Sequence, residues 1–185
     1  MDTVYGSDFI KAEGESMDSP VTGHIVQGTM DLRAQIDAQA SVKNQPTFFH
    51  LRAQLPRQGR TDTPMAATDR MWVVLKTYAS DGENELHAHP NEDHVFLVLQ
   101  GEAEFFGPKG ELKRVKKHDG ILLPRGTFYW FKAIGEEPLV MARIGAVVDA
   151  AKDALARIDF EGKPMDGNSA ANKTVPVILS DRWFD

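Results

Sequence analysis

The stretch "HAHPNEDHVFLVLQG", residues 87–101, places three histidines within eight residues and then runs into an apolar segment that ends at a glycine. On a strand, side chains two residues apart face the same side, so His87 and His89 would project together, about 7 Å apart. The turn-forming "PNED" that follows allows the chain to fold back. A third imidazole, that of His94, can then meet the other two.

Three imidazoles that meet at one point favour a metal site. Imidazole is the commonest metal-binding side chain, and three of them suit transition metals better than magnesium or calcium. The chain has no cysteine, so nitrogen and oxygen atoms must supply any ligands. We predict that His87, His89 and His94 bind one divalent transition metal per chain, with Fe(II) preferred and Zn, Ni, Mn or Cu as alternatives.

Composition and charge limit the function classes. A chain of 185 residues with 42% hydrophobic and 26% charged residues is typical of one soluble domain. A net charge of -6, with no basic run longer than "KRVKK", predicts no nucleic-acid partner. The sequence shows neither a signal-peptide pattern nor an apolar run of membrane-spanning length. We expect a cytoplasmic protein without a membrane partner.

The sequence after residue 70 predicts an all-β fold. Short runs with alternating character are separated by turn sequences such as "GPKG", "KHDG" and "PRG". The pattern is typical of a sandwich or small barrel. The run "HVFLVLQ", 94–100, is apolar on both faces and predicts a strand that is covered on each side. The expected strands are 47–55, which "PRQGRTDTP" then interrupts, 70–78, 85–89, 94–100, 102–106, 111–115, 120–124, 127–133 and 138–147.

The two ends of the chain differ from the centre. Residues 1–46 are polar and predict an N-terminal arm, with one weak helical pattern in "TMDLRAQIDAQA" at 29–40. Residues 47–147 are expected to form the barrel, and 148–185 a C-terminal helix and tail. The helix is predicted over 147–158 from its alanine-rich composition. The end of the tail is expected to return as an extended segment over the barrel or onto a partner chain.

The histidine stretch resembles the first motif of the cupin superfamily, which reads glycine, five residues, H-x-H, three or four residues, glutamate, six residues, glycine. Two departures are visible: the first spacing is four residues, and a histidine occupies the glutamate position. The six-residue spacing to the last glycine favours that histidine over the neighbouring acidic residues Glu92 and Asp93. The matching positions are Gly82, His87, His89, His94 and Gly101.

A second motif of the same superfamily, glycine, five residues, P-x-G, two residues, histidine, three residues, asparagine, is similar to "HDGILLPRGTFYWFKA". Pro124 and Gly126 match, whereas His118, Tyr129 and Ala133 stand at the positions of the glycine, the histidine and the asparagine. The resemblance covers about residues 70–147. It implies a double-stranded β-helix, or jelly-roll, barrel, and it implies a homodimer.

The altered motifs predict a particular chemistry. Three neutral imidazoles leave the full charge of a divalent ion in place, which favours a small-molecule anionic substrate. Within the superfamily, the arrangement resembles thiol dioxygenases and diketone-cleaving enzymes. The first hypothesis is a non-haem iron dioxygenase acting on a small organic anion. In this hypothesis Tyr129 orients or protonates an intermediate, and Arg125 reaches over the barrel mouth to a substrate carboxylate.

Several alternatives stay open at this stage. A tyrosine beside the metal also resembles cupin lyases, so a metal-dependent lyase or isomerase is the second hypothesis. The third is a non-catalytic module that binds a small ligand, and whether the chain is an enzyme stays open. Tyr129 could instead be a buried phenol with a structural hydrogen bond, and Arg125 a surface residue of a turn. Arg143 and Lys76, polar residues in apolar strands, could point inward as anion anchors or outward.

Overall fold

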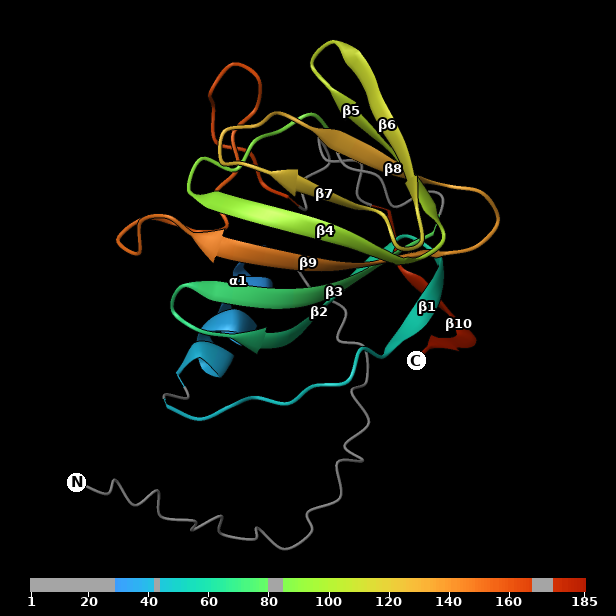
Figure 1. The fold of residues 1–185 in the computed structure, drawn as a ribbon, viewed down its shortest axis with the longest axis horizontal. Helices are drawn as coiled ribbons and strands as arrows, with labels where there is room; N and C mark the ends of the chain where they lie inside the picture. The colour runs from blue at the N-terminus through green and yellow to red at the C-terminus, as the bar shows by residue number, and fades with distance from the viewer. Residues whose placement is uncertain (1–28, 42–43, 80–84, 168–174) are drawn as a thin grey trace, which may run out of the picture.

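The computed structural model describes residues 29–41, 44–79, 85–167 and 175–185 (Figure 1). Gly82 and most of the predicted arm lie outside these residues. The described elements are α1 (Thr29–Ala40), β1 (Ala53–Gln58), β2 (Arg60–Ala67), β3 (Met71–Tyr78), β4 (Glu92–Gln100), β5 (Glu102–Gly107), β6 (Gly110–Lys116), β7 (Gly120–Leu123), β8 (Trp130–Ile134), β9 (Leu139–Val147) and β10 (Ile178–Phe184).

The strands form an antiparallel jelly-roll barrel, which confirms the predicted double-stranded β-helix. The larger sheet has the order β2-β3-β9-β4-β7, and the smaller has the order β6-β5-β8. β9 lies between β3 and β4, so neighbours in the sheet are far apart in sequence. The two sheets enclose an aromatic core, in which the rings of Phe96, Phe105 and Phe131 lie 5.0 to 5.8 Å apart.

Alternation along β4 determines which residues enter the barrel. Glu92, His94 and Phe96 share one parity and are all buried inside. The opposite face differs from the prediction of a strand covered on each side. Leu97 is 42% exposed, and Leu122 beside it on β7 is 64% exposed. The apolar outer face is therefore only partly covered by the described residues.

Two turns of the barrel contain a residue with a positive φ, one a glycine and the other a histidine. Gly101, which ends β4, has a φ of 71°, and a Cβ there would lie 2.9 Å from the Leu139 Cα. Only glycine fits such a turn without strain. His118 also has a positive φ of 77°, although it carries a side chain. His118 is exposed in the turn before β7, so it is a turn residue and lies away from the other histidines of the motif.

The first strands differ from the sequence prediction. Residues 47–52 are extended but pair with no described strand, and β1 begins at Ala53. β1 and β2 then continue through Pro56 and Pro64, although the prolines predicted an interruption. Both prolines lie where the strand register shifts, and proline is tolerated at such irregularities because a ladder hydrogen bond is already missing.

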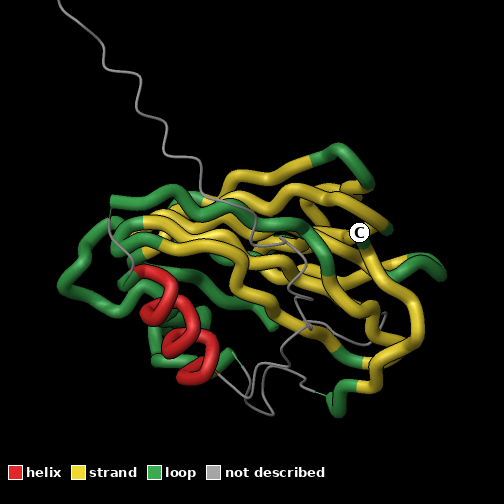
Figure 2. Tube along the Cα trace, turned by 90° about the horizontal axis from the view of Figure 1, so that it is seen from below, coloured by secondary structure: helices red, strands yellow, loops and turns green. Residues whose placement is uncertain are grey.

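The segments outside the barrel pack on the larger sheet. The predicted helix at 29–40 is confirmed as α1, which lies beside the strands (Figure 2). Leu32 and Ile36 of α1 pack against Trp72 and Val74 of β3. The predicted extended tail is confirmed as β10, which pairs with β1. The described residues contain no helix that is long and apolar enough to cross a membrane.

The predicted C-terminal helix at 147–158 is wrong, because this segment forms a series of turns. The Asp149 carboxylate accepts a hydrogen bond from the Ala151 amide at 3.0 Å, and the Asp153 carboxylate accepts one from the Leu155 amide at 2.8 Å. Aspartate side chains that bond the backbone two residues ahead favour turns over helix. Asn91 also holds Asp149 through hydrogen bonds in both directions.

A buried ion pair between Lys76 and Asp62 gives the fold a predictable response to acid. Both side chains lie on the inner face of β2 and β3. Burial alone raises the pKa of Asp62, but the cations Lys76, Arg60 and Arg143 outweigh burial and hold it below 3.8. A carboxyl with a lowered folded pKa stabilises the fold above its unfolded pKa, and this contribution is lost as the pH falls through the folded value.

We therefore expect the double variant Asp62→Asn/Lys76→Met to lose less stability than the wild type between about pH 5 and pH 2. Near pH 7 the replacement is expected to be neutral or stabilising, because a buried ion pair is often no better than packed apolar groups. Urea unfolding at several pH values measures both effects. Parallel pH profiles for the two proteins would show that Asp62 does not contribute.

Candidate metal centre

Backbone pairing holds the first two histidines at the barrel interior. The His87 amide donates to the Tyr129 carbonyl at 3.1 Å, and the Tyr129 amide donates to the His87 carbonyl at 3.0 Å. On its other side, Ala88 exchanges two hydrogen bonds with Ile158. The segment 87–89 is therefore fixed between two neighbours, and alternation directs His87 and His89 to the same side.

The structure brings the three predicted histidines together. The ring centroids of His87 and His89 are 5.2 Å apart, and those of His89 and His94 are 5.1 Å apart. All three residues are buried, with at most 3% of their surface exposed. Two imidazoles that share one ion at normal ligand distances have centroids roughly 4.5–5.5 Å apart. The spacing of the rings therefore fits a common ion.

Two of the imidazoles are also oriented as metal ligands usually are. Nδ1 of His87 lies 2.6 Å from the Glu85 carbonyl, and Nδ1 of His89 lies 3.1 Å from the Ala156 carbonyl. A carbonyl can only accept, so Nδ1 carries the proton and Nε2 keeps its lone pair. The Nε2 atom of His87 is buried and has no hydrogen-bond partner among the described residues. It is the donor most directly available to an ion.

Tyr129 contacts the third histidine. Its hydroxyl lies 3.1 Å from Nε2 of His94, while Nδ1 of His94 is buried without a partner in the described part of the chain. Burial raises the pKa of Tyr129, although the nearby Arg143 and Arg157 oppose this effect. The phenol therefore keeps its proton at neutral pH. Tyr129 can donate a hydrogen bond or a proton at this position but is a poor base.

Glu92 and Arg143 form a buried ion pair next to the histidines. The sequence left open whether Arg143 points inward or outward, and in the structure it points inward from β9. Its Nη2 lies 3.4 Å from Nε2 of His89. Glu92 Oε2 lies 3.4 Å from Nδ1 of His89. The alternation of side chains along a strand could have indicated both residues. Glu92 is two residues from His94 and therefore faces the same side of β4, and Arg143 occupies an inward-facing position of β9.

The electrostatics keep the imidazoles neutral. Burial lowers the pKa of His87 and His89 well below 6.5, and the charges of Arg143 and Arg157 lower them further. Burial also lowers the pKa of His94, to about 2. Burial raises the pKa of Glu92 to about 7, although Arg143 acts against this shift. Neutral imidazoles are the form that binds metal.

The donor set fits a transition metal, but the described residues do not hold three His or carboxylate side chains in a ready coordination arrangement. Arg143 Nη2 lies beside Nε2 of His89, and the Tyr129 hydroxyl lies beside Nε2 of His94. Metal binding would require these two groups to move from the imidazole lone pairs. The residues that would hold the ion are His87, His89 and His94.

The structure does not bring Arg125 to the histidines. Its side chain is 55% exposed and lies 3.6 Å from the Asp93 carboxylate, which also accepts from the Arg125 amide at 2.7 Å. Asp93 alternates with the inward-facing Glu92 and His94 on β4, so its side chain points out of the barrel and holds Arg125 on the outer surface. A second arginine near the histidines, Arg157, is partly exposed and comes from the segment where the sequence predicted a helix.

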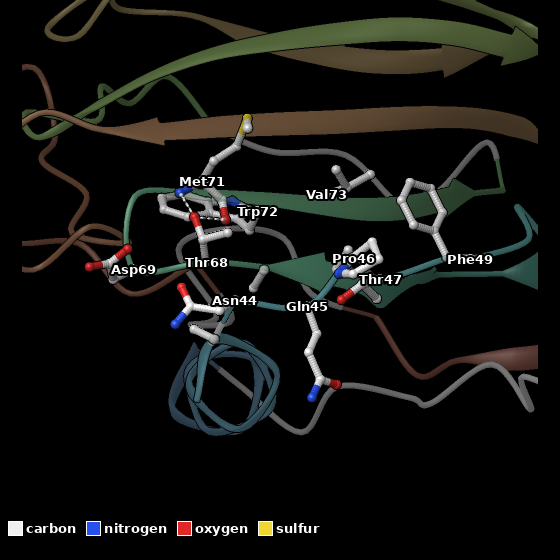
Figure 3. A pocket seen from close by; sticks show the side chains of 13 residues that line it. Asn44, Gln45, Pro46, Thr47, Phe49, Thr68, Asp69, Met71, Trp72 and Val73 are labelled. Atoms are coloured by element: carbon white, nitrogen blue, oxygen red, sulfur yellow. Dashed lines mark hydrogen bonds between the residues drawn. The ribbon is translucent and has the colours of Figure 1, made fainter. Parts of the chain in front are cut away.

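A separate groove lies outside the barrel, between the end of α1 and the β2–β3 hairpin (Figure 3). Its volume is about 620 Å³, and none of the three histidines lines it. Trp72 lies between this groove and the histidine cluster. It lines the groove, and its ring would also contact a Cβ placed on Gly145, next to Glu92. The lining includes Asn44, Pro46, Phe49, Asp69, Met71 and Trp72.

Comparison with known proteins agrees with this architecture. The model of the family described as "Cupin domain" matches residues 74–145, so this part of the chain is a cupin domain. The protein YdbB of Bacillus subtilis (strain 168) is 38% identical over 48 residues, which are 26% of this chain and 42% of YdbB. The match thus spans less than half of that relative.

The solved structures to which the chain shows some similarity include the cupin domain of Cnp3 from Schizosaccharomyces pombe, at 20% identity and a TM-score of 0.46, covering 50% of this chain and 67% of that one. Another is KdgF from Halomonas sp., at 20% identity and a TM-score of 0.43, covering 48% of this chain and 81% of that one.

Gly145 gives a direct test of the packing beside the centre. It lies in register between Trp72 and His94, and a Cβ there would be 2.3 Å from Glu92 Oε1 and 2.4 Å from the Trp72 ring. We expect Gly145→Ala to lower the free energy of unfolding by about 1–3 kcal/mol, because a packed core must shift to admit the methyl group. Gly107→Ala is the control, since a Cβ there meets only the flexible side chain of Leu112 at 3.3 Å. Equal stability of the two variants in chemical denaturation would contradict this packing.

Proposed function

We propose that this cupin is a metal-dependent enzyme in which His87, His89 and His94 hold one divalent transition metal. The observation that carries the proposal is the cluster of three buried imidazoles, in which the ring of His89 lies 5.2 Å from that of His87 and 5.1 Å from that of His94. Two of the rings, those of His87 and His89, have Nδ1 on a backbone carbonyl. Such orientation by a second partner is the usual arrangement of metal-binding histidines. The preferred reaction is oxygenation of a small organic anion.

A bound Fe(II) ion would supply the redox and Lewis-acid chemistry that such a reaction needs. The protein supplies the surroundings. The aromatic interior formed by residues such as Phe96 and Phe105 excludes water, and the nearby cations Arg143 and Arg157 attract a negative substrate. The Tyr129 hydroxyl keeps its proton and can deliver it to a substrate atom close to His94.

A metal-dependent lyase or isomerase is the second candidate. The contact between Tyr129 Oη and Nε2 of His94, at 3.1 Å, favours it, because a protonated phenol beside the centre could serve as general acid without any oxidant. The raised pKa of Tyr129 restricts this candidate to reactions in which the tyrosine donates the proton. A non-catalytic ligand-binding module is the third candidate.

One experiment separates these candidates. The protein is purified without a histidine tag, its metal content is measured, and dioxygen uptake is followed over a panel of diketones, thiols and phenolic acids. The proposal predicts one metal per chain and dioxygen uptake with Fe(II) but not with Zn. Turnover without dioxygen in the zinc-loaded protein would favour the lyase or isomerase. Ligand binding by a protein that takes up no metal would favour the module.

A further inference from the structure

The segment that contains Arg157 lies beside the histidines but outside the residues that match the cupin family. Ala88 and Ile158 exchange backbone hydrogen bonds of 3.0 Å in an antiparallel bridge. In an antiparallel pair centred on Ala88 and Ile158, Arg157 lies directly across from His89. Since neighbouring side chains alternate, Arg157 faces the same side as His87 and His89. The Ala156 carbonyl next to it contacts Nδ1 of His89.

Arg157 carries a buried donor without a partner. Its Nη1 atom makes no hydrogen bond within the described part of the chain, and Arg157 forms no ion pair with any described residue. Gly167 packs on the guanidinium so closely that a Cβ there would lie 2.3 Å from Nη1. The hydroxyl of Tyr78 is a second buried polar group without a partner among the described residues, and Tyr78 belongs to the core inside the barrel.

Two of the cations near the histidines have carboxylate partners. Lys76 pairs with Asp62, and Arg143 pairs with Glu92, both inside the barrel. Arg157 has no such counter-ion in the residues that the structure describes. Its charge nevertheless lowers the pKa of His87 and His89, so it acts on the centre itself. A buried donor without a partner is costly, and an anionic ligand that accepts a hydrogen bond from Nη1 would remove that cost.

We propose that Arg157 binds the carboxylate of a small organic acid, with the Tyr78 hydroxyl as a further donor, beside the three histidines. A guanidinium matches a carboxylate with two parallel hydrogen bonds. A carboxylate brings a single negative charge to this one guanidinium, whereas a phosphate monoester brings roughly -1.5 to -2 at neutral pH. This inference names the substrate class and to that extent rests on the proposed function, but the binding step requires no metal.

The test uses metal-free protein titrated by calorimetry with acetate, pyruvate and benzoate, and with inorganic phosphate as the competing anion. We expect at least one of the three carboxylates to bind more tightly than phosphate. Arg157→Gln should weaken that binding at least tenfold, and Arg157→Lys should retain part of it. Arg114→Gln is the matched control, because Arg114 is 58% exposed and pairs with Glu102 on the surface. Thermal unfolding of each variant shows that it is folded.

The outcomes are distinct from those of the metal experiment. The inference is overturned if no carboxylate binds the folded wild type, if phosphate binds more tightly, or if Arg157→Gln and Arg157→Lys both bind like the wild type. Should carboxylate binding depend on Arg157 in a protein that takes up no metal, the proposed function fails and the inference stands. If the protein takes up metal but binds no carboxylate, the inference fails and the proposed metal site stands.

Discussion

Arg143→Ala is expected to lower the free energy of unfolding by about 3–5 kcal/mol, because it leaves the buried Glu92 carboxylate without its partner. Arg143 is 2% exposed and Glu92 is fully buried, so water cannot replace the lost interaction. The same change also removes the group that lies 3.4 Å from Nε2 of His89. Equilibrium unfolding in urea measures the loss.

The control for this prediction removes both charges at once. Arg143→Met/Glu92→Leu should recover most of the lost stability, since apolar groups of similar size often replace a buried ion pair without net cost. The double variant should still bind metal, because all three imidazoles remain. If Arg143→Ala unfolds at the same urea concentration as the wild type, Glu92 is not held as an ionised partner of Arg143.

The second large effect concerns metal affinity. Changing His89 to alanine should weaken binding of Fe(II) or Zn by at least about 100-fold, because loss of an outer partner alone commonly costs 10–100-fold and this variant loses a ligand. His89 is the central ring of the three, because its centroid lies 5.2 Å from that of His87 and 5.1 Å from that of His94. Competition with a chelator of known affinity measures the change.

His50→Ala is the matched control for the histidine variants, since His50 is exposed and lies in the extended segment before β1. It should bind metal like the wild type. An equal loss in both variants would point to non-specific binding by surface histidines. Unchanged affinity in His89→Ala would exclude this imidazole as a ligand.

Much of the fold followed from local sequence pattern. The strand runs from residue 70 onward and their turns predicted the barrel, because alternation and turn chemistry are local signals. Two errors had non-local or competing causes. β1 and β2 pass through prolines that a register shift accommodates, and the alanine-rich segment 147–158 forms turns because Asp149 and Asp153 bond their own backbone.

The site was only partly predictable. His87, His89 and His94 share a short stretch, so spacing alone indicated that they meet. The sequence offered Arg143 as a possible inward residue but left its direction open. Arg157 reaches the same place through the bridge between Ala88 and Ile158, and pairing between such distant segments leaves no signal in a single sequence. Arg125 was expected over the barrel mouth, but Asp93 holds it outside.

Some expectations stay predictions. The homodimer is one: Leu97, Leu122 and Met71 leave apolar surface exposed on the outside of the barrel, and light scattering of the purified protein would determine its oligomeric state. The native metal is another, because availability decides it as much as ligand type does.

X-ray absorption spectroscopy of the protein loaded with one equivalent of Fe(II) or Zn tests the central claim most directly. The account predicts three imidazole nitrogens at about 2.0–2.2 Å from a single ion in the wild type, and two in His89→Ala. A first shell of oxygen atoms alone, or an imidazole count that His89→Ala leaves unchanged, would contradict a shared site for His87, His89 and His94.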